Sequence, residues 1–198
     1  MKILALTDLH GDVSILKSLI KKVITSEIDI IVIAGDLTQF ETNLNYLLAK
    51  LNSMNKPVLI IPGNHEDDEH LTETAKAYPN LICFNKKAVE FQGYLFLGYG
   101  GGGFSLEDSQ FKWLARQWYS EYQNQKIILV LHGPPFGTSL DKIDNRHVGN
   151  KDFRSFIERI KPKLVICGHL HENAGKLDTI GEIKLINPGW EGMIVEMG

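Results

Sequence analysis

The chain has 198 residues, of which 43% are hydrophobic, 23% charged and 9% aromatic. This composition is typical of a globular protein and excludes collagen-like, disordered and disulfide-scaffold classes. The 21 basic and 24 acidic residues give a net charge of −3, so the composition indicates neither a polybasic nucleic-acid surface nor a basic membrane anchor.

The apolar runs are short. The longest, at residues 30–34 and 127–131, have five residues each, whereas a membrane-spanning helix needs about 20. The first run, at residues 2–6, has no basic leader before it, which predicts a cytoplasmic location. Because no linker-like stretch or internal repeat is evident, we expect a single domain over residues 1–198. The oligomeric state stays open, a homodimer included.

Strands and amphipathic helices alternate along most of the chain. In order, we expect elements at 2–6 (strand), 16–23 (helix), 30–34 (strand), 44–51 (helix), 58–61 (strand), 94–97 (strand), 111–118 (helix), 127–131 (strand), 153–160 (helix) and 164–167 (strand). Asp12 and Asn150 are the expected N-caps of the first and last helices, and Ser105 with Asp108 forms a capping-box pattern before the third. The last 27 residues predict a closing β meander around Asn187-Pro188-Gly189. The sequence therefore predicts a layered α/β fold with helices outside and sheet inside.

Polar side chains follow five of the predicted strands. They lie in the segments Asp8-Leu9-His10, Gly35-Asp36, Gly63-Asn64-His65-Glu66, His132-Gly133 and Gly168-His169-Leu170-His171. Ligands of open α/β sheets bind outside the carboxyl ends of the strands, so these scattered segments are expected to converge on one crevice. Each segment alone is a weak signal, and their joint occurrence is the strong one.

Carboxylate, amide oxygen and imidazole are ligands for first-row divalent metals. Manganese is the favoured ion, and iron, cobalt, nickel and zinc suit the same donors. The predicted metal ligands are Asp8, His10, Asp36, Asn64, His132, His169 and His171. Seven donors are too many for one ion, so we expect two divalent ions that share a bridging carboxylate.

These motifs, D-x-H, G-D, G-N-H-E, H-G and G-H-x-H in this order, resemble those of the calcineurin-like metallophosphoesterases, in particular small uncapped prokaryotic members. The resemblance implies a four-layer sandwich of two packed mixed β-sheets flanked by helices. It also implies that Asp36 bridges two ions. One ion would be held with Asp8, His10 and His171, and the other with Asn64, His132 and His169. His65 would contact the phosphoryl oxygen or the leaving group.

The expected function is metal-dependent hydrolysis of a small phosphate ester, a phosphodiester in preference to a phosphomonoester. In this mechanism a hydroxide that bridges the two ions attacks in line, and His65 assists the leaving group. Glu66 and Asp12 are candidates for orienting imidazoles, with a surface salt bridge and a helix N-cap as their structural alternatives. The G-D-x-x-D-R-G motif of protein phosphatases is absent, because Leu37-Thr38-Gln39-Phe40 follows Asp36.

Three other functions compete with this interpretation. A dinucleotide-binding pattern, G-x-G-x-x-G, is matched by Gly98-Tyr99-Gly100-Gly101-Gly102-Gly103. That pattern also requires an acidic residue at the end of the next strand, and the next predicted strand has none. The loop is better interpreted as a wall of the metal cleft or a glycine-rich turn. A non-catalytic metal-binding scaffold on the same fold is the main alternative, and the presence of His65 favours the enzyme. A nuclease would need a basic groove, which the composition does not indicate.

Overall fold

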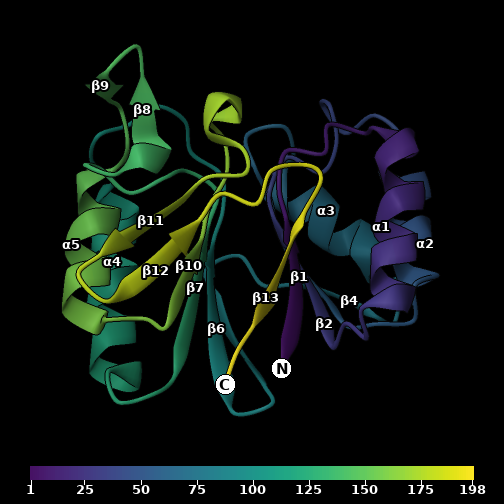
Figure 1. Ribbon diagram of the computed structural model, residues 1–198, viewed down its shortest axis with the longest axis horizontal. Helices are drawn as coiled ribbons and strands as arrows, with labels where there is room; N and C mark the ends of the chain where they lie inside the picture. Colours follow the sequence, from purple (N-terminus) through teal and green to yellow (C-terminus); the bar gives the residue numbers. More distant parts are fainter.

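Eleven of the strands form two sheets that run through the middle of the molecule (Figure 1), and the computed structural model describes residues 1–198. The first sheet has five strands in the order β13-β1-β2-β3-β4. These are β1 (Lys2–Leu6), β2 (Ile30–Ala34), β3 (Val58–Ile61), β4 (Leu81–Cys83) and β13 (Met193–Glu196). Strands β1 to β4 are parallel, and β13 pairs antiparallel with β1 at the edge.

The second sheet has six strands in the order β11-β12-β10-β7-β6-β5. These are β5 (Lys87–Phe91), β6 (Tyr94–Tyr99), β7 (Ile127–Leu131), β10 (Leu164–Ile166), β11 (Leu177–Ile180) and β12 (Ile183–Ile186). The four inner strands are parallel, and the edge strands β5 and β11 are antiparallel to their neighbours. A small hairpin of β8 (Lys142–Ile143) and β9 (Arg146–His147) projects at the top of Figure 1.

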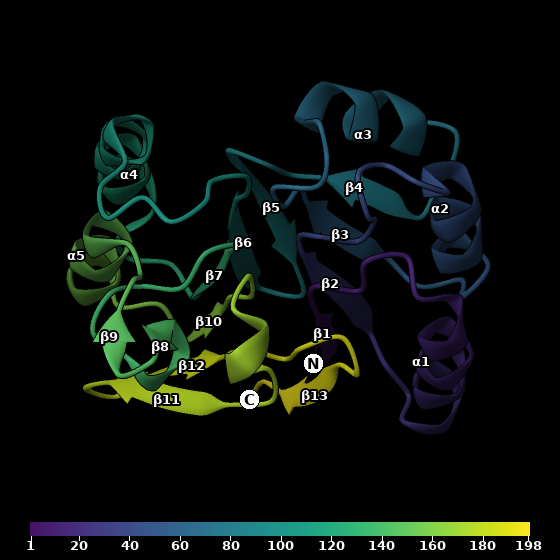
Figure 2. The same ribbon diagram turned by 90° about the horizontal axis from the view of Figure 1, so that it is seen from above.

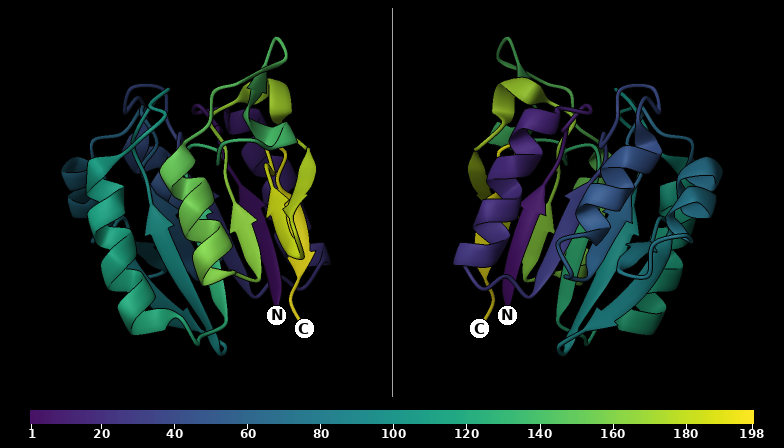
Figure 3. Two further views of the ribbon diagram at one scale, coloured as in Figure 1. Left: turned by 90° about the vertical axis from the view of Figure 1, so that its left-hand side faces the viewer. Right: turned by 90° about the vertical axis from the view of Figure 1, so that its right-hand side faces the viewer.

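Five α-helices cover the outer faces of the two sheets. They are α1 (Val13–Thr25), α2 (Leu44–Asn52), α3 (Asp68–Ala75), α4 (Ser109–Tyr122) and α5 (Lys151–Ile160), with two short 3₁₀ turns at Ser139–Asp141 and His171–Asn173. Helices α1 to α3 pack on the first sheet, and α4 and α5 pack on the second (Figures 2 and 3). The order helix, sheet, sheet, helix confirms the expected sandwich of two packed mixed sheets flanked by helices. No helix has both the length and the apolar character that crossing a membrane requires.

Alternation along the strands explains the layers. Successive side chains of a strand point to opposite faces. In β1, Leu4 packs under the helices of the first sheet, whereas its neighbour Ile3 packs between the two sheets. In β7, Leu129 packs under α4 and α5, and Val130 packs between the sheets. Strands that are buried on both faces must be apolar throughout, which is why these runs are continuous in the sequence.

Two local predictions were wrong. Helix α4 begins at Ser109 with Asp108 itself as the N-cap, because the Asp108 carboxylate accepts from the Phe111 backbone N–H; Ser105 lies outside the helix and bonds the Glu107 carbonyl. The end of the chain is not a meander, since β12 belongs to the second sheet while β13 crosses to the first. The crossing lets β13 pair with β1, so that Met193 and Val195 pack between the sheets. The caps Asp12 and Asn150 are as expected.

The termini and the polar strand ends lie at opposite ends of the molecule. The backbones of Met1 and Met197 are hydrogen-bonded to each other at the bottom of Figure 1. The carboxyl ends of β1, β2, β3, β7 and β10 point the other way. Contacts such as the one between the Gly101 N–H, which follows β6, and the Pro62 carbonyl, which follows β3, bring the strand ends of both sheets together there.

Candidate metal centre

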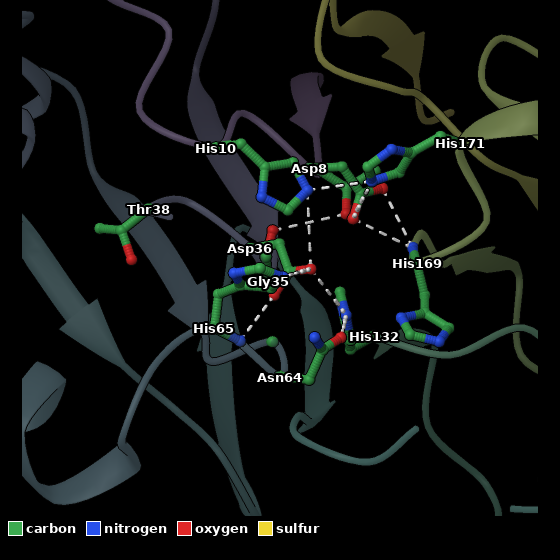
Figure 4. A network of polar contacts seen from close by, with 12 residues as sticks. Asp8, His10, Gly35, Asp36, Thr38, Asn64, His65, His132, His169 and His171 are labelled. Carbon is green, nitrogen blue, oxygen red and sulfur yellow. Dashed lines mark hydrogen bonds and ion pairs between the residues drawn. The ribbon is translucent and has the colours of Figure 1, made fainter. Parts of the chain in front are cut away.

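The seven predicted metal ligands and His65 lie together at this end of the molecule, where the two sheets meet (Figure 4). Potential ligand atoms form three groups in which all atoms lie within 4.8 Å of one another. The groups are Asp8, His10 and His171; His10, Asp36 and His65; and Asp36, His132 and His169. Because His10 and Asp36 each belong to two groups, the three form one continuous cluster. Asn64 joins it through its Oδ1 atom, 3.1 Å from His132 Nε2.

The first group faces the end of β1. The Nε2 atoms of His10 and His171 are only 2.9 Å apart, and His171 Nε2 lies 3.9 Å from Asp8 Oδ1. Two imidazole nitrogens at that separation need a shared proton or a cation between them. The Asp8 carboxylate is held in place by the backbone N–H of His169, which donates to both of its oxygens. This group therefore has the donors and the spacing for a cation.

The buried group around Asp36 has a surplus of acceptors. His132 places Nδ1 2.9 Å from the Ala34 carbonyl, so Nδ1 carries the proton of a neutral ring and Nε2 carries the lone pair. That Nε2 atom faces Asn64 Oδ1 at 3.1 Å and Asp36 Oδ2 at 3.4 Å. Three lone-pair atoms directed at one point repel one another unless a proton or a metal ion lies between them. The donor chemistry here fits a divalent cation.

Orphaned nitrogens support the same conclusion. Nε2 of His169 and Nδ1 of His65 are buried and have no hydrogen-bond partner, which is costly for polar atoms. Burial, followed by the charge of His132, lowers the pKa of His169 to about 4, so its ring is neutral at pH 7 and its lone pair is free. Burial also lowers the pKa of His10, against the opposing charge of Asp36. Neutral imidazole is the form that binds a metal.

The pKa values of Asp8, Asp36 and His132 depend on the charges of one another. Burial would raise the pKa of Asp36, but its ion pair with His132 and its hydrogen bond from His65 bring it down to about 2. Burial raises the pKa of Asp8, with His132 opposing. Burial would lower the pKa of His132, but Asp36 and Asp8 together raise it. A proton and a metal ion therefore compete for His132, and metal affinity should fall as the pH is lowered.

Four residues of the cluster have a left-handed backbone, which the sequence did not indicate. The φ angles are 55° at Asp8, 46° at His10, 50° at Asp36 and 70° at His169. Such conformations cost about 1–3 kcal/mol each and concentrate at functional sites. The surrounding hydrogen bonds hold them in place.

Glycines in the polar segments allow a close approach of the backbone, with one exception. A Cβ atom at Gly63 would clash with Asp36 Oδ1, one at Gly168 would clash with the Thr7 hydroxyl oxygen, and one at Gly35 would lie 2.5 Å from His132 Nδ1. Gly133 has no such neighbour, because its nearest contact is a Phe153 ring carbon at 3.8 Å. The first three glycines are therefore required by packing at the site.

Glu66 has a different role from either prediction. Its side chain is buried and accepts four hydrogen bonds, so it is neither a surface salt bridge nor a partner of an imidazole. Oε1 accepts from the backbone N–H and the hydroxyl of Thr38, and Oε2 accepts from the backbone N–H groups of Asp36 and Gly63. One carboxylate thus ties the loop after β2 to the loop after β3. Asp12 is a helix N-cap and not an imidazole partner.

The glycine-rich loop after β6 borders the metal centre. Its residues 101–105 line a hollow that reaches His169, in agreement with the predicted wall of the cleft. The dinucleotide hypothesis is not supported, because helix α4 begins only at Ser109 and the Asp108 carboxylate caps its N-terminus, where a phosphate would bind. His70 is exposed on α3 beside Glu41, and His147 lies in β9 paired with the buried Asp141.

A two-sheet α/β sandwich with an Asp, Asn and His cluster at its strand ends is the architecture of a metal-dependent phosphoesterase. The sequence model of the calcineurin-like phosphoesterase family matches residues 1–173, and the chain belongs to this family. The crystal structure of TT1561 of Thermus thermophilus superposes with a TM-score of 0.79 at 17% identity, covering 96% of this chain and 89% of that one. It shows the same fold.

Relatives of this chain extend over most of its length. An uncharacterized protein of Methanocaldococcus jannaschii, MJ1162, is 30% identical over 95% of this chain and 88% of its own length. A probable glycerophosphodiester phosphodiesterase of Arcobacter nitrofigilis is 25% identical over 72% of this chain, and a probable cyclic nucleotide phosphodiesterase of Synechococcus is 26% identical over 73%. The matched regions are 56% and 58% of these two relatives, so the chain aligns with little more than half of each.

Proposed function

We propose that this protein hydrolyses phosphodiesters with a pair of divalent metal ions, manganese being the favoured ion. The observation that carries the proposal is the cluster of lone-pair atoms around Asp36, which lies in two overlapping donor groups and is only 2% exposed. The phosphodiesterase names of two relatives favour a diester over a monoester.

The proposed ligands divide between the two ions through Asp36. One ion would be held by Asp8, His10, Asp36 and His171, and the other by Asp36, Asn64, His132 and His169. When bound, two such ions supply a water that is activated at neutral pH and positive charge that stabilises the phosphoryl group in the transition state. The chain itself fixes the donors: the Ala34 carbonyl sets the tautomer of His132, and the His169 backbone orients Asp8.

His65 is the proposed catalytic residue, which donates a proton to the leaving oxygen. Its backbone N–H bonds Asp36 Oδ1 at 3.0 Å, and its Nε2 lies 4.0 Å from Asp36 Oδ2. The ring also lies beside His10, with centroids 4.7 Å apart. His65 is therefore at the centre of the cluster, within reach of a phosphate ester bound there.

Manganese-dependent hydrolysis of bis(p-nitrophenyl) phosphate tests the proposed activity. We expect turnover that disappears with a chelator and returns when manganese is added. Two bound ions per chain, measured by elemental analysis, should accompany activity. Metal binding without turnover on a panel of diesters and monoesters would contradict the proposed enzyme and support a scaffold.

His65→Ala is expected to lower kcat by roughly 10² to 10⁴, the usual contribution of a general acid, while two ions remain bound. The control is His70→Ala, which removes an exposed imidazole from α3 whose ion pair with Glu41 contributes little. Elemental analysis decides the role, because His65 also forms a donor group with His10 and Asp36. Loss of an ion from His65→Ala would make His65 a ligand and remove it from proton transfer.

A further inference from the structure

Two exposed phenylalanine rings lie directly against the metal centre. Phe40 is 72% exposed, and its ring centroid lies 4.3 Å from that of His65. Phe104 is 64% exposed, and its ring centroid lies 4.8 Å from that of His169. His65 and His169 belong to different donor groups that share Asp36, so the two rings flank Asp36. Two exposed rings against one polar cluster differ from apolar side chains scattered singly over a surface, because apolar surface rimmed by polar residues marks binding sites.

The two rings come from opposite halves of the molecule. Phe40 lies in the connection between β2 and α2 of the first sheet, and Phe104 lies in the connection between β6 and α4 of the second. In Figure 2, the connection between β6 and α4 lies on the left-hand side of the molecule, and the connection between β2 and α2 lies on the right. A ligand held by the metal donors would therefore lie between an aromatic ring of each half.

The backbone at Phe40 is strained and firmly held. Phe40 and Glu41 have φ angles of 48° and 61°, a conformation that is unfavourable for bulky side chains. The segment is fixed on one side by Thr38, which bonds Glu66 and accepts from the Glu41 N–H, and on the other by the Glu41 carboxylate, which accepts from the Asp67 N–H. Strained backbone that is held by its surroundings clusters at active sites and ligand-binding loops. The exposed ring of Phe40 on such a loop is therefore a candidate for ligand binding.

Apart from His169, the polar side chains beside Phe104 already have hydrogen-bond partners. The hollow next to it reaches His169 and includes Ser105, Asp108 and Asn150. Ser105 donates to the Glu107 carbonyl, and Asp108 accepts from the Phe111 N–H and the Tyr99 hydroxyl. Asn150 caps α5 and donates to the Ser105 carbonyl.

Because these polar side chains already have partners, the main surface open to a ligand beside His169 is the face of the Phe104 ring. Such a surface favours a flat unsaturated group over a polyhydroxylated one, because stacking on an aromatic face needs no hydrogen bond.

We propose that Phe40 and Phe104 form an aromatic clamp that selects phosphodiesters carrying a flat aromatic group, a nucleoside above all, over glycerol-type diesters. This inference rests on the proposed phosphodiesterase activity and names the substrate class of the same site. The donor cluster would hold the phosphate, and one or both rings would stack on the organic group.

The test compares two methyl diesters that share one leaving group, adenosine 5′-(methyl phosphate) and glycerol 3-(methyl phosphate), with methanol release as the readout. We expect the wild type to prefer the nucleoside diester by at least tenfold in kcat/KM, mainly through KM, since stacking on an aromatic side chain contributes on that scale. The preference should fall below threefold in the double variant Phe40→Ala/Phe104→Ala. Trp113→Ala, which removes an exposed ring from α4, is the matched control and should keep the preference.

Binding supplies a readout that needs no turnover. The manganese-loaded wild type should bind adenosine 5′-monophosphate about tenfold more tightly than ribose 5-phosphate in calorimetric titrations, and the double variant should bind the two alike. Equal binding by the wild type, or a preference that survives in the double variant, overturns the clamp. Selective binding without hydrolysis of any diester would instead leave the clamp standing and refute the proposed activity, so the two failures are distinguishable.

Discussion

Replacing Asp36 by asparagine is expected to weaken both metal sites together and to lower kcat/KM by roughly a thousandfold, which corresponds to about 4 kcal/mol of transition-state stabilisation. The Asp36 carboxylate has one oxygen bonded to the His65 N–H and the other directed at His132, His10 and His65. An asparagine can keep only one of these roles. If its oxygen still accepts the hydrogen bond from the His65 N–H, its NH₂ group points at the metal donors and repels a cation.

Calorimetric metal titration and thermal unfolding check this result. The control is Asp12→Asn, which also removes one carboxylate. Asparagine caps a helix as well as aspartate does, so α1 keeps its N-cap. We expect Asp12→Asn to retain both ions and full activity. Retention of one site at wild-type affinity in Asp36→Asn would contradict the bridging assignment, because a ligand of one ion alone would leave the other site intact.

The sequence predicted the strand ends well because their signals are local. Continuous apolar runs that end in Asp, Asn or His mark both a doubly buried strand and the polar group that follows it, as at Ala34 and Asp36. The path of β13 could not be predicted in this way, because its partner β1 is about 190 residues away and the pairing depends on which sheet edge is free. The local pattern of residues 193–195 is the same in either arrangement.

The supporting residues of the site were harder to predict than the donors. Glu66 follows His65 in a motif that suggests chemistry, yet its four hydrogen bonds reach backbone groups that no sequence pattern identifies. Phe40 carries no glycine or asparagine beside it that would indicate a left-handed backbone, and its exposure depends on where the loop after β2 is anchored. Strain and exposure arise from tertiary structure, so they became visible only with the fold.

Replacing Glu66 by glutamine is expected to lower the free energy of unfolding by about 2–5 kcal/mol and to reduce metal affinity as well. Each carboxylate oxygen accepts two hydrogen bonds, one pair from Thr38 and the other from the backbones of Asp36 and Gly63. A glutamine amide turns one oxygen into an NH₂ donor, which then faces donors. At least one buried backbone N–H loses its partner, and the loops that carry Asp36 and Asn64 are no longer tied together.

Urea unfolding and metal titration of Glu66→Gln separate this positioning role from a general loss of charge. Glu73→Gln is the matched control, since Glu73 is exposed on α3 and pairs only with Lys76, a surface contact of small value. Glu66→Asp keeps the charge but is one methylene shorter, so it should recover part of the stability and part of the metal affinity. Wild-type stability together with wild-type metal affinity in Glu66→Gln would refute the role. Because Glu66 is placed to act through the backbone of Asp36, a loss of metal affinity should appear in both ions and not in one.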